Sequence, residues 1–157
     1  MAPAVDDYPP LGFYYSVDIV AEGLEKHSGD ARFQSVSGLS VEYEYESFKE
    51  GGENRFEHKL PVRTRYSDLV LKRGMLTDSP LAAWMLRAFR DREFAPADLT
   101  VILLNEQGDP LRTWKVNHAT PKKWSVSDFD SQSSALVVET IECSYRYFSL
   151  RFSGLIA

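Results

Sequence analysis

The sequence is poor in the residues that build disulfides and metal sites. It holds a single cysteine, Cys143, and three histidines, His27, His58 and His118. One cysteine cannot form an internal disulfide. Zinc ligands recur at short fixed spacings, and no histidine here has a second histidine or a cysteine within five residues of it. The sequence therefore predicts neither a disulfide scaffold nor a metal site, and the lone cysteine fits a reducing cytoplasm.

Long apolar runs and a basic excess are missing too. No apolar run, residues 101–104 included, approaches the roughly 20 residues that span a bilayer. The first ten residues carry Asp6, Asp7 and three prolines but no basic residue, unlike a secretory signal. The 18 Lys and Arg against 23 Asp and Glu leave a net charge of −5, which disfavours a duplex-DNA binder. We expect a protein that is soluble when made.

Motifs that bind phosphates or activate nucleophiles are also absent. Gly51 and Gly52 lack the spacing and the lysine of a P-loop, and no Gly-x-Ser-x-Gly motif occurs. Ser37 precedes a glycine inside a predicted strand, not between a strand and a helix. Cys143 lies on the apolar side of the last predicted strand, without the electropositive setting that reactive cysteines need. We therefore expect no enzymatic activity and no cofactor.

What the sequence does contain is apolar and aromatic material for one core. Hydrophobic residues make up 43% of the 157 residues, and aromatic residues 13%. A chain of this length forms one domain and buries roughly two-thirds of the surface that it exposes when unfolded. Such a composition excludes a disordered chain. We expect a single domain over residues 1–157, with terminal extensions at 1–10 and 149–157.

Most of the chain shows strand patterns. Residues 41–46 alternate strictly between apolar and acidic side chains, as in a strand with two different faces. They end a longer predicted strand, residues 32–46, in which a change of phase near Gly38 indicates a bend. The other predicted strands cover residues 13–20, 55–60, 69–71, 99–104, 111–116, 118–126 and 135–148. Pro61 is expected to end the strand at 55–60.

One segment has helical spacing. Ser79 and Pro80 form a helix start, with a capping hydroxyl followed by a proline in the first turn. The apolar residues that follow share one helical stripe: Leu81, Trp84, Met85, Ala88 and Phe89. Many strands with one short helix predict a mainly β fold, an antiparallel β-sandwich or open β-barrel with the helix on one flank.

A set of short motifs, taken in order, resembles one family. The most specific are Leu-Lys-Arg-Gly at residues 71–74 and a Trp…Ala-x-Pro-x-x-Trp pattern at 114–124. The remaining segments of the set are residues 33–39, 51–54, 60–61, 98–104 and 138–141, with Trp84 in the predicted helix. Over residues 13–148 the chain resembles the inner-tube protein family of contractile phage tails and phage-tail-like extracellular contractile injection systems.

The resemblance implies a structural subunit. Six copies are expected to close into a ring by joining their sheets, and rings to stack into a hollow conduit for nucleic acid or protein effectors. Joining removes the unpaired strand edges that a monomer must protect, and a head-to-tail contact that does not close gives a filament.

The resemblance also implies the partners of this subunit. They are further copies of the chain, a surrounding sheath protein, a hub or baseplate protein at the tube end and transient cargo in the lumen, with no insertion into a membrane. Assembly is expected in the cytoplasm, in a particle that can be released extracellularly.

A loop is predicted to take part in this assembly. Its residues are Ser47, Phe48, Lys49, Glu50, Gly51, Gly52, Glu53 and Asn54. Two adjacent glycines cost entropy to order, so we expect the loop to become ordered against a neighbouring protomer or ring. A plain surface hairpin is the alternative.

Three glutamates are predicted to face the lumen. Glu42, Glu44 and Glu46 share one face of their strand. We expect them to line the tube as a negative wall that repels phosphates and acidic cargo within roughly 8–10 Å. The outer surface, against the sheath, is the alternative placement.

Tyrosines supply the main competing interpretation. Tyr14, Tyr43, Tyr45, Tyr145 and Tyr147 could form the platform of a small-ligand or carbohydrate-binding β-sandwich. Alternating tyrosines belong more often to a core or an interface, so a tube subunit is the favoured function. A hydrolase built from scattered Ser, His and Asp residues is the least favoured.

Overall fold

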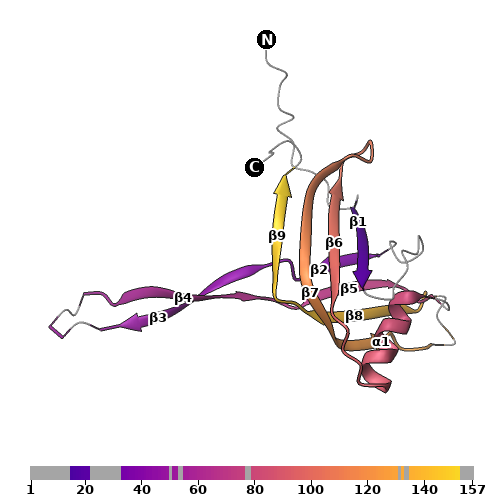
Figure 1. The fold of residues 1–157 in the computed structure, drawn as a ribbon, viewed down its shortest axis with the longest axis horizontal. Coiled ribbons are helices and arrows are strands. Elements are labelled where there is room, and N and C mark those ends of the chain that lie inside the picture. Colours follow the sequence, from indigo (N-terminus) through magenta and orange to yellow (C-terminus); the bar gives the residue numbers. More distant parts are fainter. Residues whose placement is uncertain are drawn as a thin grey trace, which may run out of the picture.

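The described residues form two antiparallel sheet layers, a helix and a long two-stranded arm (Figure 1). A computed structural model describes residues 15–21, 33–49, 51–52, 55–76, 79–130, 132 and 135–152. The predicted mainly β class with one short flanking helix is confirmed, and the sheets are an open sandwich.

Layer A contains four strands in the order β1-β6-β7-β9. They are β1 (Tyr15–Ala21), β6 (Ala97–Leu104), the first half of β7 (Pro110–Val126) and β9 (Tyr147–Phe152). Layer B contains the second half of β7, then β8 (Val138–Ser144), β5 (Leu69–Gly74) and β2 (Ser35–Ser37). The strands of the two layers run in clearly different directions, and β7 passes from one layer to the other (Figure 1).

The corner in β7 lies at His118, which adopts a positive φ of 56°. An extra residue on β7 shifts its register against β6 at this point, as in a β-bulge that bends a strand. The backbone N–H of His118 donates to Oδ1 of Asp98 at 3.0 Å. The sequence predicted two strands, 111–116 and 118–126; the structure has one bent strand.

The core lies between the layers and is closed by α1 (Pro80–Arg90). Leu69, Leu71 and Ile141 come from layer B and Leu99 and Val116 from layer A, all fully buried. From α1, four of the five predicted stripe residues are buried: Leu81, Trp84, Met85 and Ala88. Phe89 is 46% exposed, so that part of the prediction was wrong. Ser79 caps the helix as predicted, its Oγ accepting from the Ala82 N–H.

The arm consists of β3 (Val41–Phe48) and β4 (His58–Tyr66), which pair with each other (Figure 1). The predicted strand at 32–46 is therefore two strands, β2 and β3, separated by a bend at Gly38, where φ is +90°. The prediction that Pro61 ends a strand was wrong. Pro61 lies inside β4 beside a register shift, and a strand of a two-stranded arm has one unpaired edge on which a missing N–H costs nothing.

The last predicted strand, 135–148, also divides in two. β8 ends at Ser144, and β9 begins at Tyr147 in the other layer. Alternation is maintained through Ile141, Cys143 and Tyr145, all buried, which is why the sequence pattern read as continuous.

Candidate assembly surfaces

The arm is the most exposed element of the described chain. Its strands pair only with each other there, and every β3 side chain except Glu44 is classed as exposed. An isolated two-stranded hairpin is marginally stable in water and needs a surface to pack against. Figure 1 shows the arm projecting far from both layers. Such an element is suited to bind another molecule.

One face of the arm is largely uncharged. Tyr43 and Tyr45 are each 60% exposed, and Val41 is 48% exposed on the same face. Across the strand pair, Tyr43 lies opposite Thr64 and Tyr45 opposite Pro61. We call this the apolar face of the arm.

The opposite face carries the three glutamates. Their predicted position on one side of a strand is confirmed by the register. Glu42 lies opposite Arg65, and Glu44 opposite Arg63, with 3.0 Å between Arg63 Nε and Glu44 Oε2. Because two arginines balance two of the glutamates, this face is not the strongly negative wall that the sequence indicated. Their placement in a lumen stays a prediction.

The tip of the arm contains the predicted assembly loop. Ser47 and Phe48 end β3, and Gly51 and Gly52 form a turn in which Gly52 has a φ of +103°. Lys49 pairs with Glu57 at 3.1 Å across the tip. Glu50, Glu53 and Asn54 lie outside the described residues. The assembly role of the loop stays a prediction.

The root of the arm is held by backbone contact. A side chain at Gly38 would overlap the carbonyl of Asp68, so the two connections into the arm pack directly on each other. The Tyr145 hydroxyl donates to the Gly38 carbonyl at 2.9 Å, and Ser40 contacts Ser67. The rings of Tyr66, Tyr145 and Phe148 cluster there as well, at centroid distances from 5.5 to 6.4 Å. This root fixes the direction of the arm.

Burial changes the titration of two residues near the root. The pKa of Tyr145 is raised to about 12, first by burial and then by the neighbouring Tyr66 and Asp68. The pKa of Cys143 is also raised to about 12, by burial and by Asp68. A thiol that keeps its proton at neutral pH is a poor nucleophile, which agrees with the predicted packing role.

A groove opens between layer A and β2. Its volume is about 240 Å³, below the 300–1,000 Å³ of typical small-molecule sites. It is lined by Tyr15, Gln34, Ser35, Val36, Leu39, Val101, Leu103 and Trp114. The groove has the size of one or two side chains and a mainly apolar lining that also includes Gln34 and Ser35.

Layer A has two further features that matter for assembly. Among the described residues, β1 pairs only with β6 and β9 only with β7, so both of its outer edges are free. The face turned away from the core is polar. Two rows cross it: Asp18, Thr100, Lys115 and Ser149, then Ser16, Ile102, Thr113 and Arg151. With Asp98 it holds two acidic and two basic residues.

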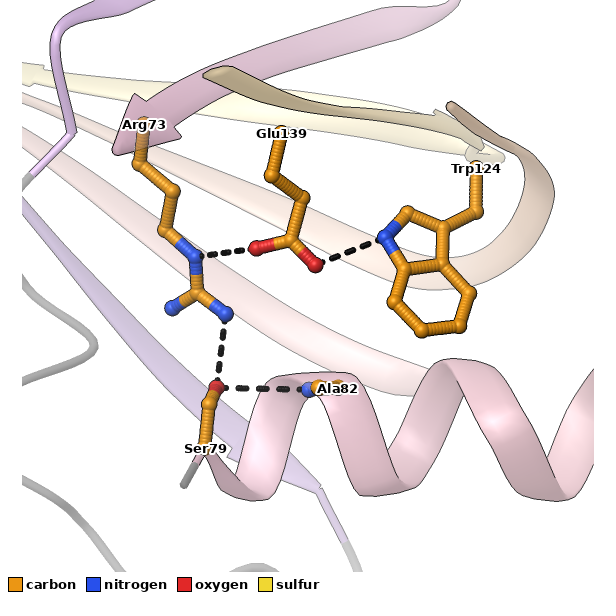
Figure 2. Close-up of polar contacts among 5 residues, drawn as sticks. All are labelled: Arg73, Ser79, Ala82, Trp124 and Glu139. Atoms are coloured by element: carbon orange, nitrogen blue, oxygen red, sulfur yellow. Dashed lines mark hydrogen bonds and ion pairs between the residues drawn. The ribbon is translucent and has the colours of Figure 1, made fainter. Parts of the chain in front are cut away.

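A buried polar cluster ties layer B to α1 (Figure 2). Arg73 and Glu139 are fully buried, with 2.8 Å between Nε and Oε2. Trp124 Nε1 donates to the other oxygen of Glu139 at 2.6 Å, and Arg73 Nη2 donates to the Ser79 Oγ at 2.7 Å. The guanidinium also lies 5.7 Å from the centroid of the Phe33 ring. Arg73 is the arginine of the Leu-Lys-Arg-Gly motif on which the family resemblance rests, and it follows the predicted strand at residues 69–71.

The described residues contain little that could perform chemistry. No three His, Cys, Asp or Glu side chains among them are grouped to hold a metal ion. His58 lies near the arm tip against Phe56, His118 lies at the β7 corner, and His27 is outside the described residues. No helix of the described segments has the length and apolarity to cross a membrane.

The tyrosines proposed for a ligand platform do not come together. Tyr43 and Tyr45 lie on the arm, Tyr145 is buried at its root, and Tyr147 begins β9. Tyr14 lies outside the described residues. The described tyrosines give no support to a carbohydrate-binding surface.

Comparisons with known proteins point in one direction. The profile of the T4-like virus tail tube protein gp19 matches residues 11–149. A chain in the six-fold symmetrised cryo-EM structure of the anti-feeding prophage baseplate is 30% identical at a TM-score of 0.87, covering 94% of this chain and 99% of that chain. No curated protein sequence matches.

Two more distant structures share the fold. A chain of the sheath–tube complex of the extracellular contractile injection system PVC, in the extended state, is 24% identical at a TM-score of 0.79, covering 94% of this chain and 95% of that one. Hcp1 from Flavobacterium johnsoniae is 19% identical at a TM-score of 0.52, covering 90% and 97%.

Proposed function

The chain belongs to the T4-like virus tail tube protein family, and on that premise we propose that it assembles into six-membered rings that stack into a hollow conduit. It is a structural tube protein of a contractile, phage-tail-like particle. The two outer edges of layer A, which have no partner strand among the described residues, support ring closure most directly. When β9 of one copy pairs with β1 of the next, both exposed edges are satisfied and the four-stranded layers become one closed sheet.

The number six is supported by a relative. The baseplate structure that contains the 30% identical chain is six-fold symmetrised. Stacking of the rings is supported by the arm, which projects beyond the layers (Figure 1). We propose that the loop at 47–54 is an assembly element, as its glycines predict.

Curvature decides which face of the closed sheet looks inward. Layer B and α1 cover the core face of layer A, and the bulkier side of a curved wall must lie on the outside. The polar face with Asp18, Thr100, Thr113 and Lys115 then lines the lumen. Its balanced charges and hydroxyl groups attract neither phosphates nor basic peptides strongly, which suits a passage for cargo.

The predicted lumen position of Glu42, Glu44 and Glu46 needs a further condition. The arm continues from β2 and β5 of layer B, so these glutamates reach the lumen only if the arm turns to the inner side of the ring. Labelling distinguishes the two faces. Thr113→Cys is expected to react with a small maleimide only through open tube ends. If Glu44 lies outside, Glu44→Cys is expected to react as fast in tubes with closed ends as in tubes with open ends.

The remaining features of the proposed role concern partners and chemistry. We propose one domain over residues 1–157, assembled in the cytoplasm without cofactor or catalytic activity. Its partners are a sheath protein around the tube and a hub or baseplate protein at the tube end, since relatives occur in a sheath–tube complex and in a baseplate.

Negative-stain microscopy of the purified protein tests the proposed function. Rings or tubes with a central channel support a tube subunit. A stable monomer at high protein concentration, with normal circular dichroism, would count against it and in favour of a binding module.

A further inference from the structure

Two surfaces of this chain are incomplete in the protomer. The apolar face of the arm exposes Tyr43 and Tyr45, and the groove between layer A and β2 is open. Contiguous exposed apolar surface marks an interaction site. The arm and the groove belong to the same chain, so a second copy offers a groove to the exposed tyrosines of the arm and an arm to the open groove.

The direction of the arm relates these surfaces. The arm leaves the body past β9, on the side away from β1 (Figure 1). Its root contacts β9 itself, where the rings of Tyr66 and Phe148 meet at 5.5 Å. If β9 pairs with β1 of the next copy, the arm must extend over that copy, starting from its β1. The groove includes Tyr15 of β1, so it lies on the side that the arm reaches first.

The dimensions agree with this arrangement. β3 has eight residues, about 26 Å at the usual rise per residue of a strand. The four strands of layer A are about 19 Å across at about 4.8 Å per strand. Tyr43 and Tyr45 are the third and fifth residues of β3, so they lie about 7–14 Å from its start. That range covers the strands β1, β6 and β7 of a neighbour, which contribute Tyr15, Val101, Leu103 and Trp114 to the groove.

Both surfaces also lie on the same side of the ring wall. The arm continues from β2 and β5 of layer B, and the groove lies between layer A and β2. The arm therefore lies on the layer B side of layer A, as the groove does.

We propose that Tyr43 and Tyr45 of the arm insert into the groove of the adjacent copy in the same ring. The apolar lining receives the aromatic rings, and Gln34 and Ser35 of the same lining offer hydrogen-bonding groups to the phenol hydroxyls. A groove of about 240 Å³ is of the size for such side chains. This inference rests on the ring proposed above and names the contact that holds neighbouring subunits together beyond their paired strands.

Disulfide cross-linking of assembled protein tests the contact. The variant Tyr45→Cys with Ser35→Cys is imaged first without oxidant, then oxidised and run on a non-reducing gel. The native Cys143 is buried and does not interfere. We expect rings in the microscope and a ladder of bands that ends at six subunits. Glu44→Cys with Ser35→Cys, on the opposite face of the arm, is the matched control and is expected to stay monomeric on the gel.

Each other outcome has a definite meaning. Normal rings with no ladder, or an equal ladder from the control pair, overturn this contact and leave the proposed function intact. Bands larger than six subunits mean that the arm contacts a copy in the next ring. A monomer band that runs faster on the gel means that the arm contacts the groove of its own chain. Both results overturn the inference. Absence of any ring in the native chain overturns the proposed function as well.

Filling the groove provides a second readout. Ser35→Trp is expected to leave a folded monomer by circular dichroism but to lose most ring formation, because the indole occupies the space of the incoming tyrosines. Rings at the native level from this variant contradict the contact.

Discussion

The body and the arm of this protein hold the same kinds of residues in opposite settings. In the body, Arg73 and Glu139 form an ion pair whose side chains are 0% and 2% exposed. On the arm, Arg63 and Glu44 form one whose side chains are 73% and 43% exposed. The body buries its ion pair within one chain, whereas the arm leaves its ion pair and its tyrosines exposed. The body is therefore built for stability of the protomer, and the arm for contact with another molecule.

The largest expected effect comes from breaking the buried pair. Glu139→Gln removes the negative charge from a buried ion pair with Arg73, and we expect a loss of about 3–5 kcal/mol in the free energy of unfolding. Glu44→Gln, the matched change on the arm, is expected to cost less than about 1 kcal/mol. Urea denaturation followed by tryptophan fluorescence measures both. Equal losses in the two variants would remove the distinction between body and arm.

The next largest effect is expected at the junction of the two regions. Gly38→Ala forces a side chain against the Asp68 carbonyl at a positive φ, and we expect a loss of more than about 2 kcal/mol. Gly52→Ala, at the arm tip, has a similar φ but open space around it, so only about 1 kcal/mol of backbone strain is expected there. Urea denaturation followed by tryptophan fluorescence measures both variants. A tolerated Gly38→Ala would show that the arm root is not tightly packed.

The next effect concerns pH and is absent at neutral pH. Burial raises the pKa of the Cys143 thiol from 9.0 to about 12, so above pH 9 the unfolded chain releases a proton that the folded chain keeps. The folded state then binds more protons, and its stability falls as pH rises from 9 to 12. Cys143→Ala is expected to flatten this decline, leaving the part due to Tyr145, whose pKa is raised in the same direction. It also costs a modest packing penalty and leaves assembly intact. An unchanged pH slope contradicts the burial argument.

The smallest effect on the protomer is expected at the arm tip. Deleting residues 49–53 is expected to leave the unfolding free energy nearly unchanged, because the described residues Lys49, Gly51 and Gly52 are exposed, and to abolish ring stacking. His58→Gln, close to the loop, serves as the control and is expected to assemble normally. Electron microscopy with circular dichroism separates the two results. Normal tubes from the deletion would refute the role of the loop, and failed assembly of His58→Gln would contradict the view that this histidine has no function.

Local signals in the sequence were enough for much of this fold. Ser79 and Pro80 marked the helix start, and the alternation from Val41 to Glu46 marked β3 and its two faces. The independence of the arm was not predictable, because alternation does not say whether an apolar face is covered within the chain. The prediction that Pro61 ends a strand was wrong for the same reason, because a proline is tolerated in a strand such as β4 that has no second partner strand at that edge.

The sequence also could not show long-range contacts. Arg73 and Glu139 are hydrogen-bonded although they are 66 residues apart in the sequence. Tyr145 and Gly38 are hydrogen-bonded although they are 107 residues apart. Only Gly38, a glycine inside a strand pattern, pointed to one of them. The arginines opposite the glutamates likewise became visible only with the register of β4.

A cryo-EM map of the assembled tube would test ring closure through layer A most directly. We predict that β9 of each subunit pairs with β1 of its neighbour and that Thr100, Thr113 and Lys115 face the lumen. A map in which these edges stay unpaired, or in which that face points outward toward the sheath, would contradict the proposed assembly.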